Sequence, residues 1–256
     1  MKKYRGVFLK NEREIGLLRE ANRMVAMILD ELGRQVRPGL PTMYFEEIVQ
    51  KMCREFKVKP AFQGMYGFPY GLCCSVNEVI VHGFPSEDVI LKEGDIVSVD
   101  VGAYIGGFHG DCAATYACGT ISEEAQRLID VTRQSFFEGI AQAREGNRIS
   151  DISHAVQAYV EANGFSVVRE YVGHGIGRNM HEAPEIPNFG APGHGPKLLR
   201  GMTIAVEPMV NAGTAAIRQM SDGWTVKTRD GKYAAHYENT ILITAGEPEI
   251  LTAPAP

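Results

Sequence analysis

The chain has 256 residues and a formal net charge of −5 at pH 7, with 26 Lys and Arg against 31 Asp and Glu. This length allows one large domain or two fused halves, and the acidic balance argues against nucleic acid as the main partner. We expect a cytoplasmic protein with reduced thiols, because its N-terminal residues lack the apolar run of a signal peptide, no stretch approaches a membrane span, and its five cysteines form no CxxC pair.

The first predicted elements are two helices. Between residues 12 and 32 apolar side chains recur at helical spacing, and Gly33 follows as a stop. After the turn RPGLPT a second helix is expected, with Thr42 as its N-cap and apolar residues from 45 to 56 on one side. Residues 72–82 then have a strand pattern with a turn at Asn77 and Glu78, so two helices precede a sheet.

The segment IVSVDVGAYIGGFHGD, residues 96–111, predicts a hairpin that carries two carboxylates. Its valines alternate with polar or small residues, as in a strand with one apolar face. A two-residue turn at Gly106 and Gly107 pairs 102 with 111 and 100 with 113, so Asp100 and Asp111 become diagonal neighbours roughly 7 Å apart. Two anions this close in an apolar hairpin either share a proton or hold a cation between them. The alternative of two solvated aspartates suits Asp111 but not Asp100, which lies between two valines.

The two-helix plan then repeats. Ser122 is expected to cap a helix, the turn AREGNR follows, and a further helix stops at Gly164. Seven positions of this region match positions 107 residues earlier: Arg37 and Arg144, Gly39 and Gly146, Val49 and Val156, Gln50 and Gln157, Gly94 and Gly201, Val99 and Val206, and Asp100 and Glu207. This pattern predicts an internal duplication, with halves of approximately 10–118 and 119–250 and a catalytic cleft between them.

Four carboxylates and one imidazole form the candidate metal site: Asp100, Asp111, His174, Glu207 and Glu238. Two divalent cations balance four carboxylates, and mixed oxygen and nitrogen ligation suits manganese, iron, cobalt or zinc better than calcium. Two such ions share a water, lower its pKa and polarise a carbonyl, which indicates hydrolysis. A serine or cysteine nucleophile has weaker support, because no GxSxG occurs and Cys73 and Cys74 have no adjacent base.

Several stretches along the chain carry a more specific signal: VNEVIVHG, GDIVSVDVG, GFHGD, VREYVGHGIGRNMHE, GMTIAVEPMVNAG, DGWTVKT and YENTILIT. Through these stretches the chain resembles a type I methionine aminopeptidase throughout its length. The resemblance implies a duplicated α/β (α+β) pita-bread fold, with two pseudo-symmetric halves around a central antiparallel sheet and residues 1–256 as a single catalytic domain. It also implies removal of the initiator methionine from nascent chains, with a preference for a small second residue.

The resemblance assigns a role to each site residue. By motif, Asp100 would hold one metal ion, Asp111 and Glu238 would bridge two, and His174 and Glu207 would complete the second. Glu207 would also handle the proton of the attacking water. Two further histidines are implied to act on the substrate, His181 at its carbonyl and His82 near the scissile amide; taken alone they fit a core or loop position.

The family's methionine pocket maps onto Phe62, Met65, Phe68, Cys73, Met180 and Trp224. Met65 and Phe68 stand where tyrosines are frequent, Phe62 where cysteine is, and Met180 where phenylalanine is. A flexible, sulfur-rich slot of this kind accepts an unbranched thioether, and we expect looser selectivity among leucine-sized or norleucine-sized residues. Asn239 replaces the histidine that usually follows the last metal-binding glutamate. We expect this change to disturb slightly the residues that surround the metal ligands.

The resemblance implies nascent polypeptides with an N-terminal methionine as partners, transient association with the ribosome, and a monomer. The nearest alternative is a prolidase or an aminopeptidase acting before proline, although such relatives usually carry an additional N-terminal domain. A metal-free binding protein of the same fold is a second alternative, but all five ligands are present. A calcium-stabilised structural module does not explain His174.

Overall fold

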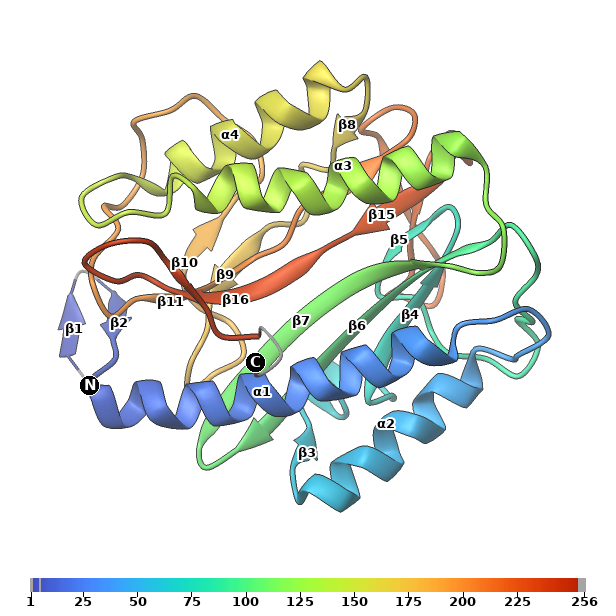
Figure 1. The fold of residues 1–256 in the computed structure, drawn as a ribbon, viewed down its shortest axis with the longest axis horizontal. Helices are drawn as coiled ribbons and strands as arrows, with labels where there is room; N and C mark the ends of the chain where they lie inside the picture. Colours follow the sequence, from blue (N-terminus) through green and yellow to red (C-terminus); the bar gives the residue numbers. More distant parts are fainter. Residues whose placement is uncertain (1, 5, 253–256) are drawn as a thin grey trace.

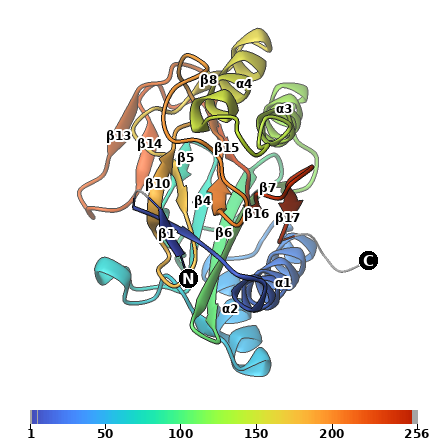
Figure 2. The ribbon, with the colours of Figure 1, turned by 90° about the vertical axis from the view of Figure 1, so that its left-hand side faces the viewer.

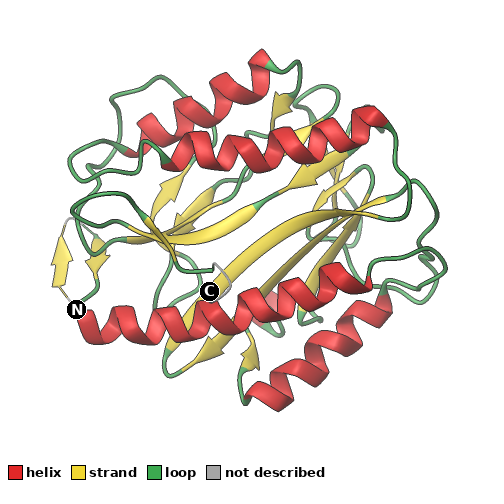
Figure 3. Cartoon of the chain, viewed as in Figure 1, coloured by secondary structure: helices red, strands yellow, loops and turns green. Residues whose placement is uncertain are grey.

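Two pairs of helices flank an antiparallel sheet in the computed structural model of the chain, which describes residues 2–4 and 6–252 (Figure 1). The first pair is α1 (Glu12–Gln35) and α2 (Met43–Phe56), and the second is α3 (Glu123–Ile140) and α4 (Ile149–Ala162). The same view coloured by secondary structure shows the strands between the two pairs (Figure 3). The sequence predicts a frayed tail at APAP, residues 253–256, which lies outside the described residues.

Strands from both halves form the central sheet. Within the described residues its order is β10-β9-β11-β16-β7-β6-β3, with β4 also paired to β6 and β17 to β16. The bounds are β3 (Lys59–Pro60), β4 (Leu72–Val76), β6 (Ile96–Ile105), β7 (Phe108–Ala117), β9 (Gly173–Gly175), β10 (Glu182–Ile186), β11 (Thr203–Val206), β16 (Glu238–Leu242) and β17 (Glu249–Ile250). Because β16 of the second half pairs with β7 of the first, the two halves share one continuous sheet.

Smaller sheets complete the fold. Their strands are β1 (Lys2–Tyr4) with β2 (Val7–Leu9), then β8 (Ser166–Val167), β12 (Met209–Asn211) and β15 (Ala234–His236), and β5 (Val79–Val81), β13 (Ile217–Gln219) and β14 (Val226–Thr228). A view turned by 90° places β5, β13 and β14 on the side of the molecule opposite α1 and α3 (Figure 2). None of the helices in the described part of the chain has the length and apolar character needed to cross a bilayer.

The predicted hairpin is confirmed in its register. Asp100 lies opposite Ala113 and Gly102 opposite Asp111, as the alternation and the turn required. The turn residues Gly106 and Gly107 have φ values of 61° and 88°. A two-residue turn of this kind needs positive φ at both positions, which glycine adopts without a steric cost.

One prediction about a helix end is wrong, and another is right in position but lacks the expected hydrogen bond. Gly33 does not stop α1, which continues to Gln35; instead, the ring of Tyr116 packs where a side chain at Gly33 would lie. Thr42 is the N-cap residue of α2, as predicted, but its side chain makes no capping hydrogen bond, because its Oγ1 accepts a hydrogen bond from Ser86 N at 2.9 Å. Ser122, by contrast, caps α3 as predicted and accepts from Ala125 N.

Matching backbone contacts in the two halves support the internal duplication. Gly39 N donates to Leu91 O at 2.8 Å, and its counterpart Gly146 N donates to Leu198 O at 3.0 Å. The two donor glycines are 107 residues apart in the sequence, and so are the two acceptor leucines. The two glycines also share a left-handed backbone, with φ of 89° and 95°.

The contact of α1 with β7 depends on Gly110. A Cβ at this position would lie 2.9 Å from Asn22 N and Cα, which are backbone atoms of α1. We therefore expect Gly110→Ala to push the helix from the sheet and to lower the free energy of unfolding by about 1–3 kcal/mol. Urea unfolding measures this change.

The matched control is Gly16→Ala in the same helix, where no described atom outside the adjacent residues and the helix's own backbone lies within 4 Å of the added Cβ. Alanine is the better helix former at such an exposed site, so this variant is expected to gain up to about 1 kcal/mol. Equal unfolding midpoints for Gly110→Ala and the wild type would contradict the close approach of α1 to β7.

Candidate active site

Strand register places a row of side chains across the sheet. Cys73 on β4 lies opposite Asp100 on β6, Asp100 opposite Ala113 on β7, and Ala113 opposite Glu238 on β16. Residues directly opposite in antiparallel strands point to the same face. Asp111, two residues before Ala113, shares that face because side chains alternate along a strand. Three predicted carboxylates therefore meet on one surface.

The second half supplies the remaining two predicted ligands. Val206, the last residue of β11, pairs with Asn239, so the next step of the same register brings Glu207 beside Glu238. His174 is the central residue of β9, which pairs with β11. Equivalent positions of the two halves, Asp100 and Glu207, thus lie at one site, where the duplication placed the cleft.

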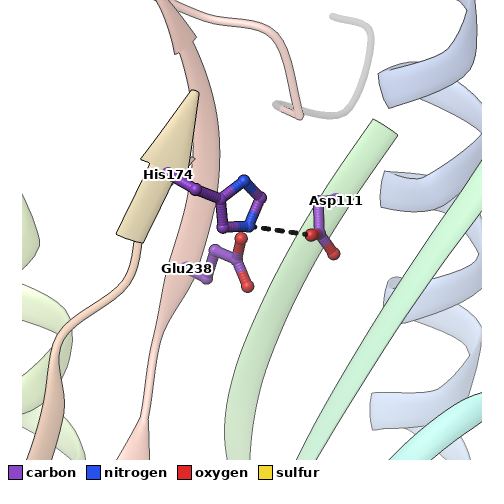
Figure 4. Close-up of side chains that lie close together, drawn as sticks. All are labelled: Asp111, His174 and Glu238. Atoms are coloured by element: carbon purple, nitrogen blue, oxygen red, sulfur yellow. Dashed lines mark ion pairs between the residues drawn. The ribbon is translucent and has the colours of Figure 1, made fainter. Parts of the chain in front are cut away.

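The donor atoms of this group converge. His174 Nε2 lies 3.6 Å from Asp111 Oδ2 and 3.6 Å from Glu207 Oε1. One donor atom each from Asp111, His174 and Glu238 lies within 4.8 Å of the other two. Figure 4 shows these three side chains pointing toward one another from β7, β9 and β16. This geometry suits coordination of a common ion.

The electrostatics of the carboxylates also fit a metal centre. Burial raises the pKa of Asp100, Asp111, Glu207 and Glu238 well above the usual range, and the negative charge of neighbouring carboxylates adds to the shift for all but Asp111. One oxygen of each of Asp100, Asp111 and Glu238 is buried without a hydrogen-bond partner among the described residues. Divalent cations supply the missing countercharge and occupy such oxygens, and the donor set of oxygens with imidazole nitrogen is typical of transition metals.

His236 belongs to this site and was missed as a site residue in the sequence. Its Nε2 lies 3.8 Å from Glu207 Oε2 and 3.9 Å from Glu238 Oε2, and its side chain is 2% exposed. Burial lowers the pKa of His236 to about 3, so the ring is neutral. The signal was its place two residues before Glu238, since positions i and i+2 of an extended chain share a face.

Asn239 is turned away from the carboxylates. It follows Glu238 on β16 and therefore points to the opposite face of the sheet. Its Oδ1 accepts a hydrogen bond from Thr252 Oγ1 at 2.7 Å. The amide at this position thus ties β16 to the end of the described chain.

A cavity of about 590 Å³ has the four carboxylates on one part of its wall and apolar side chains on another. Five of the six predicted pocket residues line it: Phe62, Met65, Phe68, Cys73 and Trp224. Met180 does not line it, because it packs behind Phe62 in a small cluster with Ala61 and Ile176. The cavity also has Val81, Tyr66, Tyr171 and Met209 in its wall, which sequence reasoning missed.

Both additional histidines lie at this cavity. The ring of His181 is 4.5 Å from that of His174, and the ring of His82 is 5.3 Å from that of Tyr171. Burial lowers the pKa of His82 and of His181 to about 4. Both imidazoles are therefore neutral near pH 7, and each has one N–H to donate.

Comparison with known proteins agrees with the fold and the site. Residues 16–245 match metallopeptidase family M24, and the chain belongs to this family. Within the family it is similar to methionine aminopeptidases, as the sequence motifs predicted. The methionine aminopeptidase of Clostridium perfringens is 53% identical over 246 residues, covering 96% of this chain and 98% of that protein. Methionine aminopeptidase 1 of Bacillus subtilis is 48% identical, covering 96% and 99%.

Solved structures confirm the predicted pita-bread fold. The crystal structure of methionine aminopeptidase from Thermotoga maritima superposes with a TM-score of 0.95 at 46% identity, covering 96% of this chain and 99% of that one. Prolidase from Pyrococcus furiosus has a TM-score of 0.79 at 18% identity, covering 97% of this chain and 66% of that one. The prolidase shares the fold, and its low identity carries no further conclusion.

Proposed function

We propose that this metallopeptidase removes the N-terminal methionine from nascent polypeptides, with a preference for a small second residue. The observation that carries the proposal is the convergence of four carboxylates and His174 in a cavity of about 590 Å³ whose remaining wall is largely apolar. The carboxylates supply a place for hydrolysis, and the cavity supplies a place for an apolar side chain. The similarity to methionine aminopeptidases over 96% of the chain supports methionine as that side chain.

We propose two divalent ions at the carboxylates, drawn from manganese, iron, cobalt or zinc. Asp100 would hold one ion, Asp111 and Glu238 would bridge both, and His174 and Glu207 would complete the second. When bound, such ions lower the pKa of a water molecule and polarise the substrate carbonyl. The unpaired buried oxygens of Asp100, Asp111 and Glu238 support this assignment.

The protein's own groups then move the protons. Glu207, whose Oε1 lies 3.6 Å from His174 Nε2 at the centre of the donor group, takes the proton of the attacking water. His181 donates its N–H to the carbonyl oxygen of the scissile bond, and His82 contacts the amide. Both roles need a neutral imidazole, and the pKa of about 4 provides one across the neutral range.

The apolar wall of the cavity selects the first residue. Phe68 and Trp224 pack edge to face at 5.0 Å and form a rigid aromatic side, while Met65 and Cys73 contribute polarisable sulfur. Met180 shapes this wall from behind through its contact with Phe62. We propose that this lining accepts methionine and discriminates only moderately against leucine-sized and norleucine-sized residues.

We propose that residues 1–256 act as a single catalytic domain, as a cytoplasmic monomer in transient contact with the ribosome. Its partners are polypeptides that begin with methionine, with no role for nucleic acid or membrane. The resemblance to methionine aminopeptidases supports this setting. The net charge of −5 supports the absence of nucleic acid from the list of partners.

Amino-acid release from three peptides tests this function. Metal-stripped protein is re-supplied anaerobically with manganese, iron, cobalt or zinc and incubated with Met-Ala-Ser, Leu-Ala-Ser and Ala-Pro-Ala. We expect metal-dependent release from Met-Ala-Ser, slower release from Leu-Ala-Ser and none from Ala-Pro-Ala. Cleavage of the proline peptide would reassign the protein to the prolidase-like activities. No release with any metal would instead favour a binding protein of the same fold.

A further inference from the structure

A buried ion pair joins the start of α1 to the segment that carries His181. Lys10 Nζ lies 2.7 Å from Glu182 Oε2, and the two side chains are only 2% and 1% exposed. Lys10 stands immediately before Asn11, the N-cap of α1, and Glu182 immediately follows His181. The pair therefore links elements that are 172 residues apart in sequence.

The surrounding backbone is built around this pair. Lys10 N donates to Gly201 O at 2.8 Å, which fixes the lysine to the segment before β11. Glu182 Oε1 accepts from Asn179 N at 3.3 Å within its own loop. Gly177 provides the space, since a Cβ there would lie 2.6 Å from Glu182 Oε1 and 2.7 Å from Lys10 Cε. Both charged groups are thus held at defined positions.

Stability does not explain the pair. Removing two charges from water costs about as much as their attraction returns, and apolar replacements of similar volume are often neutral or stabilising. The best-attested use of a buried polar pair is to fix one register among several. Glu182 lies at such a place, because the register between β9 and β10 is irregular there.

This register affects the positions of His174 and His181. Glu182 pairs with Gly175, but the register of β9 and β10 shifts before the next pair, in which Glu185 lies opposite His174. The ion pair fixes Glu182, the residue at the N-terminal side of this register shift. His181 precedes it, and the ring of His181 lies 4.5 Å from the ring of His174.

We propose that Lys10 and Glu182 are positioning residues, whose buried ion pair fixes the start of β10 so that His181 faces the carboxylates. The inference rests on the proposed function, in which His181 acts on the substrate carbonyl. Glu182 is one of the residues that line the cavity, but its side chain is only 1% exposed, so in this proposal neither partner touches the substrate or the metal. They act through the position of His181.

The test replaces both partners at once, as Lys10→Met/Glu182→Met, so that no lone charge stays buried. We expect this variant to keep the wild-type urea midpoint while kcat for Met-Ala-Ser falls about 10- to 100-fold, because small misplacements of a catalytic group are costly. KM is expected to change less than about threefold, because the apolar wall is untouched. In a His181→Ala background the same double replacement is expected to cause no further loss of kcat.

The matched control is the ion pair of Arg19, which lies in α1, with Glu249; its side chains are 47% and 36% exposed. Arg19→Met/Glu249→Met is expected to leave kcat unchanged. Wild-type kcat in the Lys10 and Glu182 double variant would overturn the proposal. So would an equal additional loss of kcat in the His181→Ala background, since that is the result of a merely structural role.

A second readout separates this inference from the proposed function. The histidine ring signals of the metal-free protein are recorded by NMR, with the His181 signal assigned from the His181→Ala variant. The double replacement is expected to shift the His181 signal and leave those of exposed His154 and His194 in place. An unmoved His181 signal overturns the positioning role, whether or not the wild type releases methionine; wild-type inactivity on all peptides overturns the proposed function.

Discussion

Glu207→Gln is expected to reduce methionine release by about 10²- to 10⁴-fold, which is the range for loss of a general acid–base group. The amide keeps the shape of the side chain but cannot take the proton of the attacking water. It also removes the negative charge that faces His174 Nε2 at 3.6 Å. Initial rates on Met-Ala-Ser with saturating metal measure the effect.

The same substitution has a distinct signature in stability. Burial and the charges of Asp111 and Asp100 raise the pKa of Glu207 well above its usual range, which means that its ionised form is disfavoured in the metal-free protein. Removing this group relieves the repulsion, so metal-free Glu207→Gln is expected to unfold at the same or higher urea concentration than the metal-free wild type. Added metal is then expected to stabilise the wild type more than the variant.

Glu185→Gln is the matched control for this prediction. Glu185 lines the same cavity from β10 but stands outside the proposed ligand set. The change from carboxylate to amide is identical, so it controls for altered charge at the cavity. Full activity in Glu207→Gln, or an equal loss in Glu185→Gln, would contradict the proposed role of Glu207.

Local pattern was sufficient to predict the hairpin that holds two of the carboxylates. The alternation of valines and the Gly106–Gly107 turn depend on neighbours in sequence, and the register that they imply is the one observed. The offset of 107 residues extended the prediction to Glu207, because a duplication carries a local pattern to a distant position. His236 lay within reach of the same logic, two residues before Glu238.

Other features depend on contacts that no local pattern encodes. Thr42 has the sequence of an N-cap, but Ser86 competes for its hydroxyl from 44 residues away. Gly33 has the sequence of a helix stop, but it is a contact point for Tyr116. Likewise, only the tertiary packing of the cavity wall decides that Phe62 lines the cavity while Met180 lies behind it.

Metal removal is expected to make the stability of the protein fall as the pH rises from about 6.5 to 8. In the metal-free protein the pKa of each of Asp100, Asp111, Glu207 and Glu238 is raised well above its usual range. The folded state therefore keeps protons that the unfolded state has already released. Stability falls with pH wherever the folded state binds more protons, by about 1.4 kcal/mol per pH unit for each proton retained.

The range from pH 6.5 to 8 separates the effect of the carboxylates on stability from the effects of histidine and cysteine. Histidines with lowered pKa, such as His236 and His82, have the opposite effect, but only below the unfolded histidine pKa of about 6.5. Buried cysteines with raised pKa, such as Cys73, add a fall of their own above about pH 8.5. Between these limits the carboxylates dominate the pH dependence.

Bound metal is expected to reverse this trend. Ligands must be deprotonated to bind, so metal affinity and the stabilisation that it provides both increase with pH. Urea midpoints at pH 6.5, 7, 7.5 and 8, with chelator or with manganese, are expected to diverge steadily. Asp100→Asn removes one of the raised carboxylates, and its metal-free slope is expected to be shallower than that of the wild type. Parallel slopes with and without metal would mean that these four carboxylates do not bind the ion, because binding would then leave their protons in place.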